Sequence, residues 1–395
     1  MKRYLFFLGS ILVMWSLLGC AQECSVTENI LPGAGRTHLY LSKLKGKRVA
    51  VVANQTSKVE DAHLVDTLLA HAIDVVKIFS PEHGFRGTKD AGETFADGMD
   101  SKTGLPLISL YGTNKKPKPA DLEDVEVVVF DIQDVGVRFY TYLSTLHYVM
   151  EACAEQQIPL IILDRPNPNG FYIDGPVLDT SRYASFIGLH PVPVVYGMTI
   201  GEYGRMINGE HWYKGADTCQ LSVITVKYYT HDSLYLLPVA PSPNLQTMEA
   251  IYLYPSLALF EGTIVSVGRG TDNPFTCYGH PDLPNKGFSF TPRSIPGASK
   301  YPKLKGEQCF GKDLTKLDMT IFLKTRKLSL TWLIESYKIL GPEYGFFKNF
   351  FYQLSGTDEL RRQIEQGMSE KAIRHSWQDD LEDFKKIRRK YLLYE

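Results

Sequence analysis

Short apolar segments alternate with helical patterns through the first half of the chain, and this alternation constrains the fold more than any other feature. In these segments β-branched and aromatic residues follow one another with few polar interruptions, which is typical of strands covered on both faces of a parallel sheet. Strands are expected at Arg48–Ala53, Asp74–Phe79, Leu105–Leu110, Val125–Asp131 and Pro159–Leu163. Helical spacing over 59–71 and 142–156 connects some of them. The pattern predicts βαβ units and an α/β fold with a parallel sheet.

The same pattern continues until a proline-rich segment interrupts it. A strand at 192–196, a helix at 199–208 and a strand at 221–226 follow the first five strands. Pro238–Asn244 then contains three prolines, which favours a domain boundary near residue 245. We therefore expect an α/β domain over 45–245.

The remaining part, 246–395, has a different composition of elements and is expected to form a second domain. It opens with an apolar stretch, Tyr252–Phe260, and a strand-like one, Thr263–Val267. Helices are expected at 330–340, 357–366 and 369–391. The mixture predicts a smaller α+β domain.

Composition excludes few functions. The chain has 395 residues, of which 44% are hydrophobic and 22% charged, with a net charge of −1. The absence of a basic excess argues against nucleic acid as a partner.

The N-terminus indicates export. Lys2 and Arg3 precede an apolar run, Tyr4–Leu18, that is too short for a membrane span and typical of a signal peptide. The run ends in Leu-Leu-Gly-Cys, similar to the lipobox of bacterial lipoproteins, so we expect a signal peptide over 1–19, a lipid on Cys20 and a tether over 20–44. The expected location is the cell envelope, periplasmic or outer surface, with the membrane as a partner through the anchor. The alternative is a plain secreted protein in which Cys20 is an ordinary thiol.

The other cysteines suggest neither a disulfide framework nor a zinc site, because five is an odd number and their spacings are wide. They are Cys24, Cys153, Cys219, Cys277 and Cys309.

Polar segments, several of them with glycine or proline, follow the predicted strands. Because every loop after a strand of a parallel sheet emerges at the same carboxyl edge, these segments predict a ligand crevice there. The segments are 54–56, 80–87, 111–114, 131–142 and 164–170. Turns alone do not require so many charges, which points to function for Glu82, His83, Arg86, Asp131, Asp134, Arg138 and Asp164. In the second part, Gly268-Arg269-Gly270 would let the backbone approach an anion closely, although an ordinary turn explains it equally well.

Several familiar catalytic motifs are absent from the sequence. There is no Gly-x-Gly-x-x-Gly after the first strand, no Walker loop, no His-Glu-x-x-His and no Gly-x-Ser-x-Gly. Carboxylates around a crevice remain, and glycoside hydrolysis needs a carboxylic acid that protonates the leaving oxygen. Glu82, between a proline and His83-Gly84, is the candidate for that acid; its alternative role is a helix cap or an ion pair.

Many long motifs occur in an order that resembles the NamZ family of exo-β-N-acetylmuramidases. In the first half these are 80–87 (SPEHGFRG), 103–106 (TGLP), 131–142 (DIQDVGVRFYTY), 164–168 (DRPNP) and 197–202 (GMTIGE). In the second half they are 241–244 (PSPN), 254–255 (YP), 261–263 (EGT) and 266–271 (SVGRGT). The similarity extends from about residue 45 to the C-terminus.

The resemblance implies a Rossmann-like N-terminal domain, a smaller C-terminal domain and an active site in the cleft between them. It also implies release of N-acetylmuramic acid from the non-reducing ends of peptidoglycan fragments, without a metal or an organic cofactor. The family's Pro-Glu-His-Gly glutamate corresponds to Glu82, the expected catalytic acid. Asp131, Asp134 and Asp164 are candidates for the opposing group, and the substrate's own acetamido group is an alternative.

Substrate contacts follow from the same resemblance. Muramic acid carries a lactyl carboxylate, for which an arginine is expected: Arg138 or Arg269 first, Arg165 third. The other expected substrate-binding residues are His83, Arg86, Gln133, Tyr140, Asn167, Glu202 and Asn244.

The chain departs from the family pattern at two places. Tyr196 stands where a histidine is expected before Gly-Met-Thr, and Leu245-Gln246 follows Pro-Ser-Pro-Asn in place of Met-Pro. Both are expected near the cleft, where they would affect substrate range more than the reaction.

Two other functions are alternatives to a muramidase. A lipoprotein that binds wall sugars for uptake without cleaving them would have the same anchor and the same fold class. A hydrolase for another ester or a phosphate is less favoured, because neither a nucleophile elbow nor a metal cluster is visible in the sequence.

Overall fold

The first half of the chain is built around one seven-stranded sheet. A computed structural model describes residues 30–82, 84–85, 97–213 and 218–395. The strand order is β5-β6-β4-β1-β7-β8-β9, and all neighbours are parallel except β5, which runs antiparallel to β6. The bounds are β1 Arg48–Ala53, β4 Asp74–Ser80, β5 Gly98–Met99, β6 Pro106–Ser109, β7 Val127–Asp131, β8 Leu160–Leu163 and β9 Leu221–Ile224. The predicted parallel sheet is confirmed.

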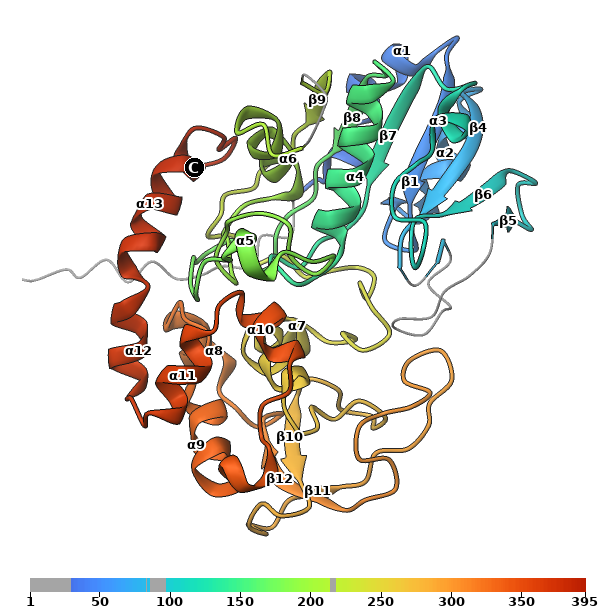
Figure 1. The fold of residues 1–395 in the computed structure, drawn as a ribbon. Helices are drawn as coiled ribbons and strands as arrows, with labels where there is room; N and C mark the ends of the chain where they lie inside the picture. Colours follow the sequence, from blue (N-terminus) through green and yellow to red (C-terminus); the bar gives the residue numbers. More distant parts are fainter. Residues whose placement is uncertain (1–29, 83, 86–96, 214–217) are drawn as a thin grey trace, which may run out of the picture.

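Both faces of the central strands are buried, as their apolar runs predicted. Val49 and Val51 of β1 belong to a core that also contains Leu64 and Leu68 of helix α2 (Leu64–Ala70). Ala50 and Val52, whose side chains alternate to the other face, belong to the core formed with α4 (Tyr142–Glu155) and α6 (Ile200–Gly209). Figure 1 shows the helices on the two sides of the sheet.

Residues 30–44, predicted to belong to a tether, are part of the folded first half. They form two 3-10 turns, Gly33–Gly35 and Thr37–Leu39, and the short helix α1 (Leu41–Leu44). Tyr40 is fully buried, and its hydroxyl donates to the carbonyl of Ala34 at 2.8 Å. The segment lacks periodicity because it consists of single turns.

Two further expectations about local structure were wrong. The helix expected from residue 59 begins at Leu64, because the short strands β2 (Lys58–Val59) and β3 (Ala62–His63) precede it and the His63 side chain caps α2. The segment 192–196 forms no strand of a sheet; Val195 alone makes isolated bridges, to residues 137 and 174.

The second half combines a small antiparallel sheet with helices. Its strands are β10 (Cys277–His280), β11 (Ser289–Phe290) and β12 (Cys309–Asp313), in the order β10-β12-β11. The strand-like segment 263–267 makes only isolated bridges. The helices are α7 (Met248–Leu257), α8 (Met319–Lys324), α9 (Thr331–Leu340), α10 (Phe350–Ser355), α11 (Glu359–Glu365), α12 (Glu370–Ser376) and α13 (Gln378–Arg389), with 3-10 turns at Ala258–Gly262 and Pro342–Tyr344.

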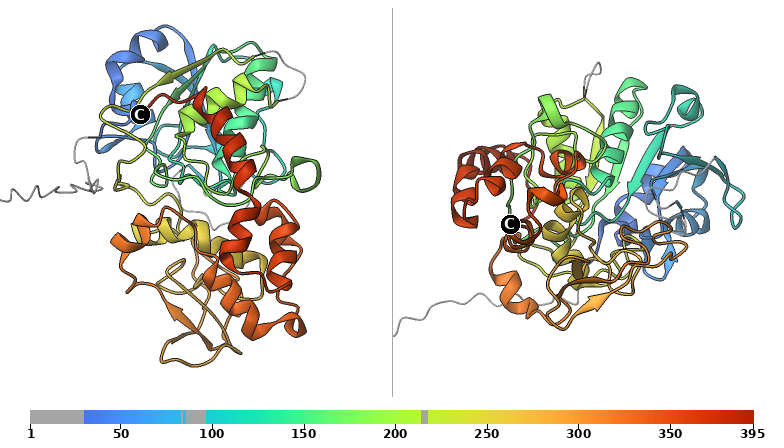
Figure 2. Two further views of the ribbon diagram at one scale, coloured as in Figure 1. Left: turned by 90° about the vertical axis from the view of Figure 1, so that its left-hand side faces the viewer. Right: turned by 60° about the horizontal axis from the view of Figure 1, so that its bottom comes forward.

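The C-terminal segment returns to the first half, as Figures 1 and 2 show. The helix expected over 369–391 is two helices, because the helix is interrupted at the buried residue Trp377. After this residue α13 leads back toward the sheet. The α13 side chain of Arg388 donates from Nε to the carbonyl of Gly197 at 2.8 Å. Past α13, the backbone N–H of Leu393 donates to Glu202 Oε1 at 2.7 Å. The two halves are therefore joined along the helical side of the molecule as well as through 238–244.

No helix within the described ranges is long and apolar enough to span a bilayer. The predicted signal peptide and Cys20 lie outside the described residues.

Candidate active site

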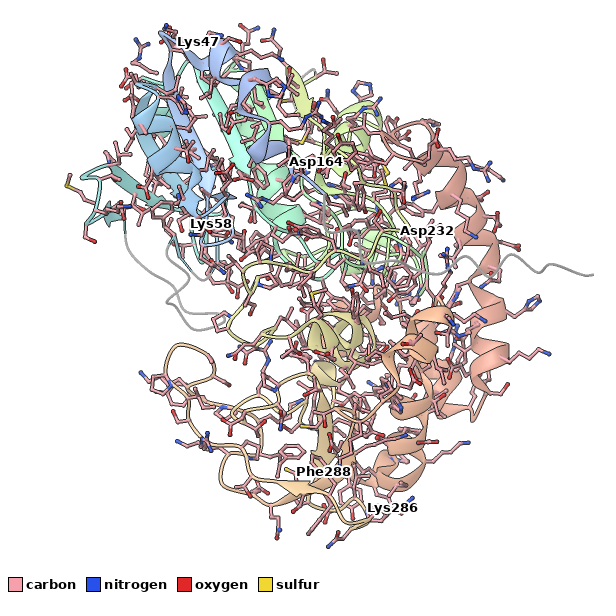
Figure 3. All side chains as sticks on the ribbon, turned by 180° about the vertical axis from the view of Figure 1, so that it is seen from behind. Lys47, Lys58, Asp164, Asp232, Lys286 and Phe288 are labelled. Carbon is pink, nitrogen blue, oxygen red and sulfur yellow. The ribbon has the colours of Figure 1, made fainter. Side chains whose placement is uncertain are left out.

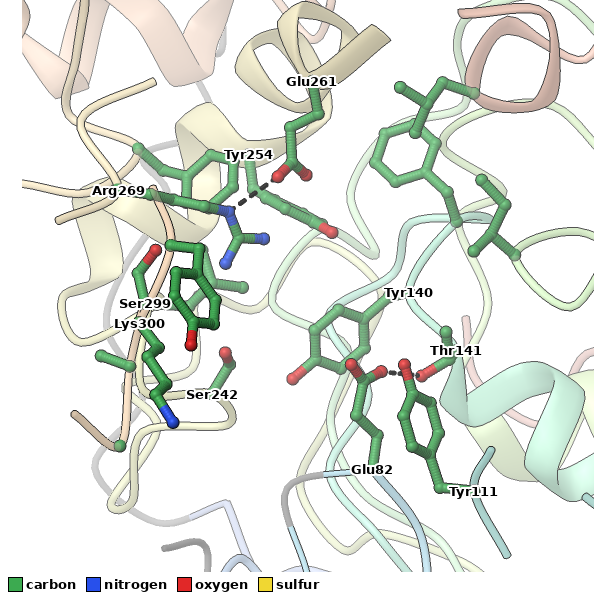
Figure 4. A pocket seen from close by; sticks show the side chains of 18 of the residues that line it. Glu82, Tyr111, Tyr140, Thr141, Ser242, Tyr254, Glu261, Arg269, Ser299 and Lys300 are labelled. Carbon is green, nitrogen blue, oxygen red and sulfur yellow. Dashed lines mark hydrogen bonds and ion pairs between the residues drawn. The ribbon is translucent and has the colours of Figure 1, made fainter. Parts of the chain in front are cut away.

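A cavity of about 1010 Å³ lies between the two halves and has walls from both. The first half contributes Glu82 after β4, Tyr111 after β6 and Tyr140 after β7, so the loops at the carboxyl edge of the sheet form one wall. The second half contributes Tyr254, Glu261, Ser294 and residues 296–301 among others. Figure 4 shows the two walls facing one another across open space. The expected cleft at the carboxyl edge is therefore present.

Glu82 points into this cavity from the loop that follows β4 (Figure 4). Thr141 Oγ1 donates to its Oε2 at 2.9 Å. The pKa of the Tyr111 phenol lies well above its usual value because it is buried and because the Glu82 carboxylate is close by and hydrogen-bonded to it. Two hydroxyl groups therefore hold the Glu82 carboxyl on the cavity wall.

Tyr140 joins this wall to the proline-rich segment between the halves. Its hydroxyl donates to the carbonyl of Pro241 at 2.8 Å, and its ring contacts Tyr142 and Tyr254 edge to face. Burial, and then the nearby tyrosines and carboxylates, raise the pKa of Tyr140 well above its usual range, so the phenol stays neutral. The predicted substrate-binding residue Tyr140 does line the cavity.

Arg269 and Glu261 form an ion pair on the opposite wall. Arg269 Nε donates to Glu261 Oε1 at 2.7 Å, and the guanidinium lies over the ring of Phe275, 4.9 Å from its centroid. Burial lowers the pKa of Arg269, but the charge of Glu261 and the hydrogen bond to it outweigh burial and raise the pKa. Gly268 and Gly270 have φ of 76° and 81°, a conformation that suits glycine and sets Arg269 at the turn. The predicted anion-binding turn therefore faces the cavity.

The segment 294–301 forms the outer part of the same wall. The side chain of Asn244 holds it, because Nδ2 donates to the carbonyl of Ala298 at 2.8 Å. Asn244, expected to touch the substrate, is therefore a support for this segment and is not among the lining residues.

The three aspartates expected to oppose Glu82 do not line the cavity. Asp131 is fully buried and makes a two-point ion pair with Arg165, whose Nε and Nη2 donate to its two carboxylate oxygens at 2.6 and 2.8 Å. The pair lies inside the first half, so Arg165 is engaged by a protein carboxylate and does not reach into the cavity.

Asp134 is held by its own loop and by Tyr196, one of the two positions at which the chain departs from the family pattern. The hydroxyl of Tyr196 and the backbone N–H of Gly136 both donate to its Oδ2, the latter at 2.6 Å. Burial raises the pKa of Asp134 to about 6. Gln133 Nε2 donates to the carbonyls of residues 134 and 166. Tyr196 and Gln133 thus support this loop away from the cavity lining, whereas Leu245, at the other departure, lines the cavity.

Asp164 and Glu202 bind the end of the chain. Tyr394 donates its hydroxyl to Asp164 Oδ2 at 2.5 Å, and Thr199 donates to the same oxygen at 2.7 Å. Figure 3 places Asp164 within the first half. Burial raises the pKa of Asp164 to about 7. Glu202 caps α6 and accepts hydrogen bonds from the backbone of residues 393 and 394.

Arg138 and Asn167 are also structural. Arg138 is buried and donates to the carbonyls of Pro176, Val192 and Leu354, each at 2.8 Å. The amide of Asn167 donates to the carbonyl of Met198 at 2.8 Å. Of the two arginines expected first to bind the lactyl carboxylate, Arg138 and Arg269, only Arg269 lies on the cavity wall. His83 and Arg86 lie outside the described residues.

Several lining residues were not among the predicted site residues. Glu261 and Tyr254 lie within motifs that carried the family resemblance, so a signal for them was present. Thr141 lies inside the segment 131–142 that was singled out for its polar cluster. Lys300 and its segment had no local signal, because they reach the cavity only through the packing of the second half.

The sequence and the structure are similar to those of known proteins over nearly the whole chain. The family profiles described as exo-β-N-acetylmuramidase NamZ, N-terminal and C-terminal, match residues 49–249 and 252–394. The peptidoglycan β-N-acetylmuramidase NamZ of Bacillus subtilis (strain 168) is 37% identical over 380 residues, covering 90% of this chain and 89% of that protein.

Two crystal structures of DUF1343 family proteins from Bacteroides fragilis NCTC 9343 are also similar. One is 47% identical with a TM-score of 0.86, and the other is 29% identical with a TM-score of 0.76. Each alignment covers 93% of this chain and 99% of the other. Together with the matching profiles, these similarities show that the chain belongs to the NamZ family.

Proposed function

We propose that this protein is a glycoside hydrolase that releases N-acetylmuramic acid from the non-reducing ends of peptidoglycan fragments. Family membership supports a glycosidase that acts on peptidoglycan. The observation that supports the chemistry most directly is the carboxyl group of Glu82 on the wall of a cavity large enough for a sugar.

Glu82 is proposed as the general acid that protonates the glycosidic oxygen as the bond to the leaving sugar breaks. Thr141 and Tyr111 position its carboxyl group through hydrogen bonds. The same carboxylate, once deprotonated, is placed to accept a proton from the attacking water.

The group that opposes Glu82 is proposed to be Glu261 or the acetamido group of the substrate. Glu261 and Glu82 are the two carboxylates among the described lining residues. Asp131, Asp134 and Asp164 are removed from the cavity by their own partners, which makes them poor candidates for a direct step.

The substrate's carboxylate is proposed to bind on the wall that carries Arg269. The terminal nitrogens of this guanidinium point into the cavity in Figure 4, while Nε is bound to Glu261. A planar guanidinium suits a carboxylate because it offers parallel donors.

Hydrolysis of 4-nitrophenyl β-N-acetylmuramide tests the proposal. Wild type should release nitrophenol, and Glu82→Gln should reduce kcat by about 10²- to 10⁴-fold, the usual contribution of general acid catalysis. Thr141→Val is a useful companion, since it should reduce kcat less while leaving Glu82 in place. A folded wild-type protein that binds the muramide without cleaving it would contradict the proposal and favour the alternative, a sugar-binding lipoprotein. No observation supports that alternative.

The second carboxylate has its own test. If Glu261 takes part directly, Glu261→Gln should reduce kcat strongly at saturating substrate. If the acetamido group does so, the 2-thioacetamido analogue of the substrate should instead be hydrolysed poorly by wild type.

We also propose that the protein is exported and anchored to the cell envelope through a lipid on Cys20. The basic pair Lys2-Arg3, the apolar run and the Leu-Leu-Gly-Cys end support this proposal. Wild type should incorporate radiolabelled palmitate in growing cells, and Cys20→Ala should not. Equal labelling of the two proteins, or no labelling of wild type, would contradict a lipid anchor at this residue.

A further inference from the structure

We propose that Lys300 is a specificity-determining residue that supplies the positive charge for recognition of an anionic sugar in this cavity. The inference rests on the proposed function in one respect, because it takes the anionic group to be the lactyl carboxylate of muramic acid. The cationic side chains around the cavity differ in how far protein groups already engage them.

Arg269 is neutralised by a protein carboxylate. Its Nε is 2.7 Å from Glu261 Oε1, and both side chains are about one quarter exposed, 24% and 23%. The pair has no net charge, so Arg269 offers a carboxylate directed hydrogen-bond donors but little uncompensated positive charge.

Arg165 and Arg138, two arginines of the first half within the described residues, are engaged in the same way or more completely. Arg165 makes its ion pair with Asp131, and Arg138 is buried against three carbonyls. Neither lines the cavity. Neither of these two arginines therefore supplies the counter-charge for an anionic substrate.

Lys300 is placed differently. It lines the cavity from the segment 294–301, and Figure 4 shows its side chain on the wall that faces Glu82. Within the described residues it forms no ion pair or hydrogen bond; its one interaction is with the neighbouring ring of Tyr301, 5.6 Å from the amino group. Its positive charge is thus available to a ligand.

The backbone is held on both sides of Lys300. Asn244 holds Ala298, and Lys303 donates from Nζ to the carbonyls of Phe260 and Val265, each at 3.1 Å. A flexible lysine on a fixed segment can reach a carboxylate already oriented by Arg269. Recognition would then combine direction from Arg269 with charge from Lys300, and it would favour muramic acid over its neutral parent, N-acetylglucosamine.

The kinetic test compares Lys300→Met with Lys305→Met on 4-nitrophenyl β-N-acetylmuramide. Both lysines are exposed and lie five positions apart in the chain, but Lys305 does not line the cavity. Lys300→Met should raise KM about tenfold with kcat within about twofold of wild type, because a charge-assisted contact to the substrate is lost. Lys300→Arg should restore most of the affinity, and Lys305→Met should behave as wild type. Added salt should raise the KM of wild type more than that of Lys300→Met.

A binding measurement separates this inference from the proposed function. Calorimetric titration with free N-acetylmuramic acid and with N-acetylglucosamine gives the preference of each variant without any need for cleavage. Wild type should prefer the acidic sugar, and Lys300→Met should lose most of that preference. If wild type binds the acidic sugar but cleaves nothing, the proposed function fails while the role of Lys300 stands. If Lys300→Met keeps the KM and the preference of Lys305→Met, or if wild type shows no preference for the acidic sugar, the role of Lys300 is refuted.

Discussion

At the residue scale, chemistry-bearing side chains at the end of a strand divide into those that face the cavity and those that face the interior. Glu82 and Tyr140 face the cavity, whereas Asp131, from the same edge of the sheet, pairs with Arg165 beneath it. A buried ion pair costs desolvation on both sides, so its main effect is seen when one partner is removed.

Asp131→Asn is therefore expected to destabilise the protein by roughly 3 kcal/mol or more, because the charge of Arg165 would remain buried without a counter-charge. Urea unfolding followed by circular dichroism measures the change. The matched control is Asp272→Asn, which removes an exposed ion pair with Arg293 and should cost about 0.5 kcal/mol or less. A folded Asp131→Asn protein with normal stability and a large loss of kcat would restore Asp131 as a candidate for direct catalysis.

Asp164 gives a prediction about pH. Its pKa in the folded protein is about 7, raised from 3.8 mainly by burial. In the folded state it binds a proton more tightly than in the unfolded state, so its contribution to stability is fully present below pH 4 and is lost as the pH rises through 7.

The stability of wild type should thus fall more between pH 5 and pH 8 than that of Asp164→Asn, which has no such proton to lose. Urea midpoints at the two pH values give the comparison, and the difference between the two proteins isolates this residue from other titrating groups. An equal pH dependence in both would show that Asp164 is ionised with its ordinary pKa in the folded protein.

At the element scale, the cavity depends on a segment that has no regular secondary structure of its own. Residues 294–301 lie on the cavity wall because Asn244, from the segment between the halves, holds the carbonyl of Ala298. Loops supported in this way commonly carry function, since their position is set by the scaffold around them.

Asn244→Ala should raise KM for the muramide several-fold, because the segment that carries Lys300 would lose a fixed position. The hydrogen bond is partly buried, so the loss of stability should be only about 1 kcal/mol. Steady-state kinetics and urea unfolding of the same preparation measure both effects. Asn244→Asp is the companion variant: it keeps the size of the side chain but loses the amide donor, and it should resemble Asn244→Ala. A loss of kcat at unchanged KM would instead indicate a role for Asn244 in the chemical step.

At the scale of the whole molecule, the contacts that hold the two halves together differ greatly in how far they are buried. Arg138, from the first half, is buried and donates to the carbonyl of Leu354 in the second. Arg182 and Asp358 also join the halves, but their side chains are 55% and 35% exposed. The C-terminal segment adds a third connection through Leu393 and Tyr394.

Arg138→Met should lower the unfolding temperature by several degrees or more, because three buried carbonyls would lose their donor, each at a cost of about 1 kcal/mol or more. Arg182→Met, which breaks the exposed connection between the same halves, should change it little. Calorimetry measures both, and wild type should unfold in one transition because the halves share a core. Similar small effects of both substitutions would show that Arg138 is not a principal contact between the halves.

The sequence by itself determined the sheet and the position of its functional edge. A strand buried on both faces must be apolar along its length, and the loops after parallel strands must meet at one edge of the sheet. Both features can therefore be predicted from short segments of the sequence. For the same reason Glu82 could be placed on the cavity wall before the fold was known.

The tertiary structure alone decided which of the remaining polar groups reach the cavity. The pairs Asp131 with Arg165, Arg138 with Leu354 and Asp164 with Tyr394 are separated by 34, 216 and 230 residues. No local sequence pattern predicts that such partners meet. Each aspartate or arginine lies in the interior because its partner is there. Glu261 and Lys300 reach the cavity by the converse route, because packing of the second half against the first brings them opposite Glu82.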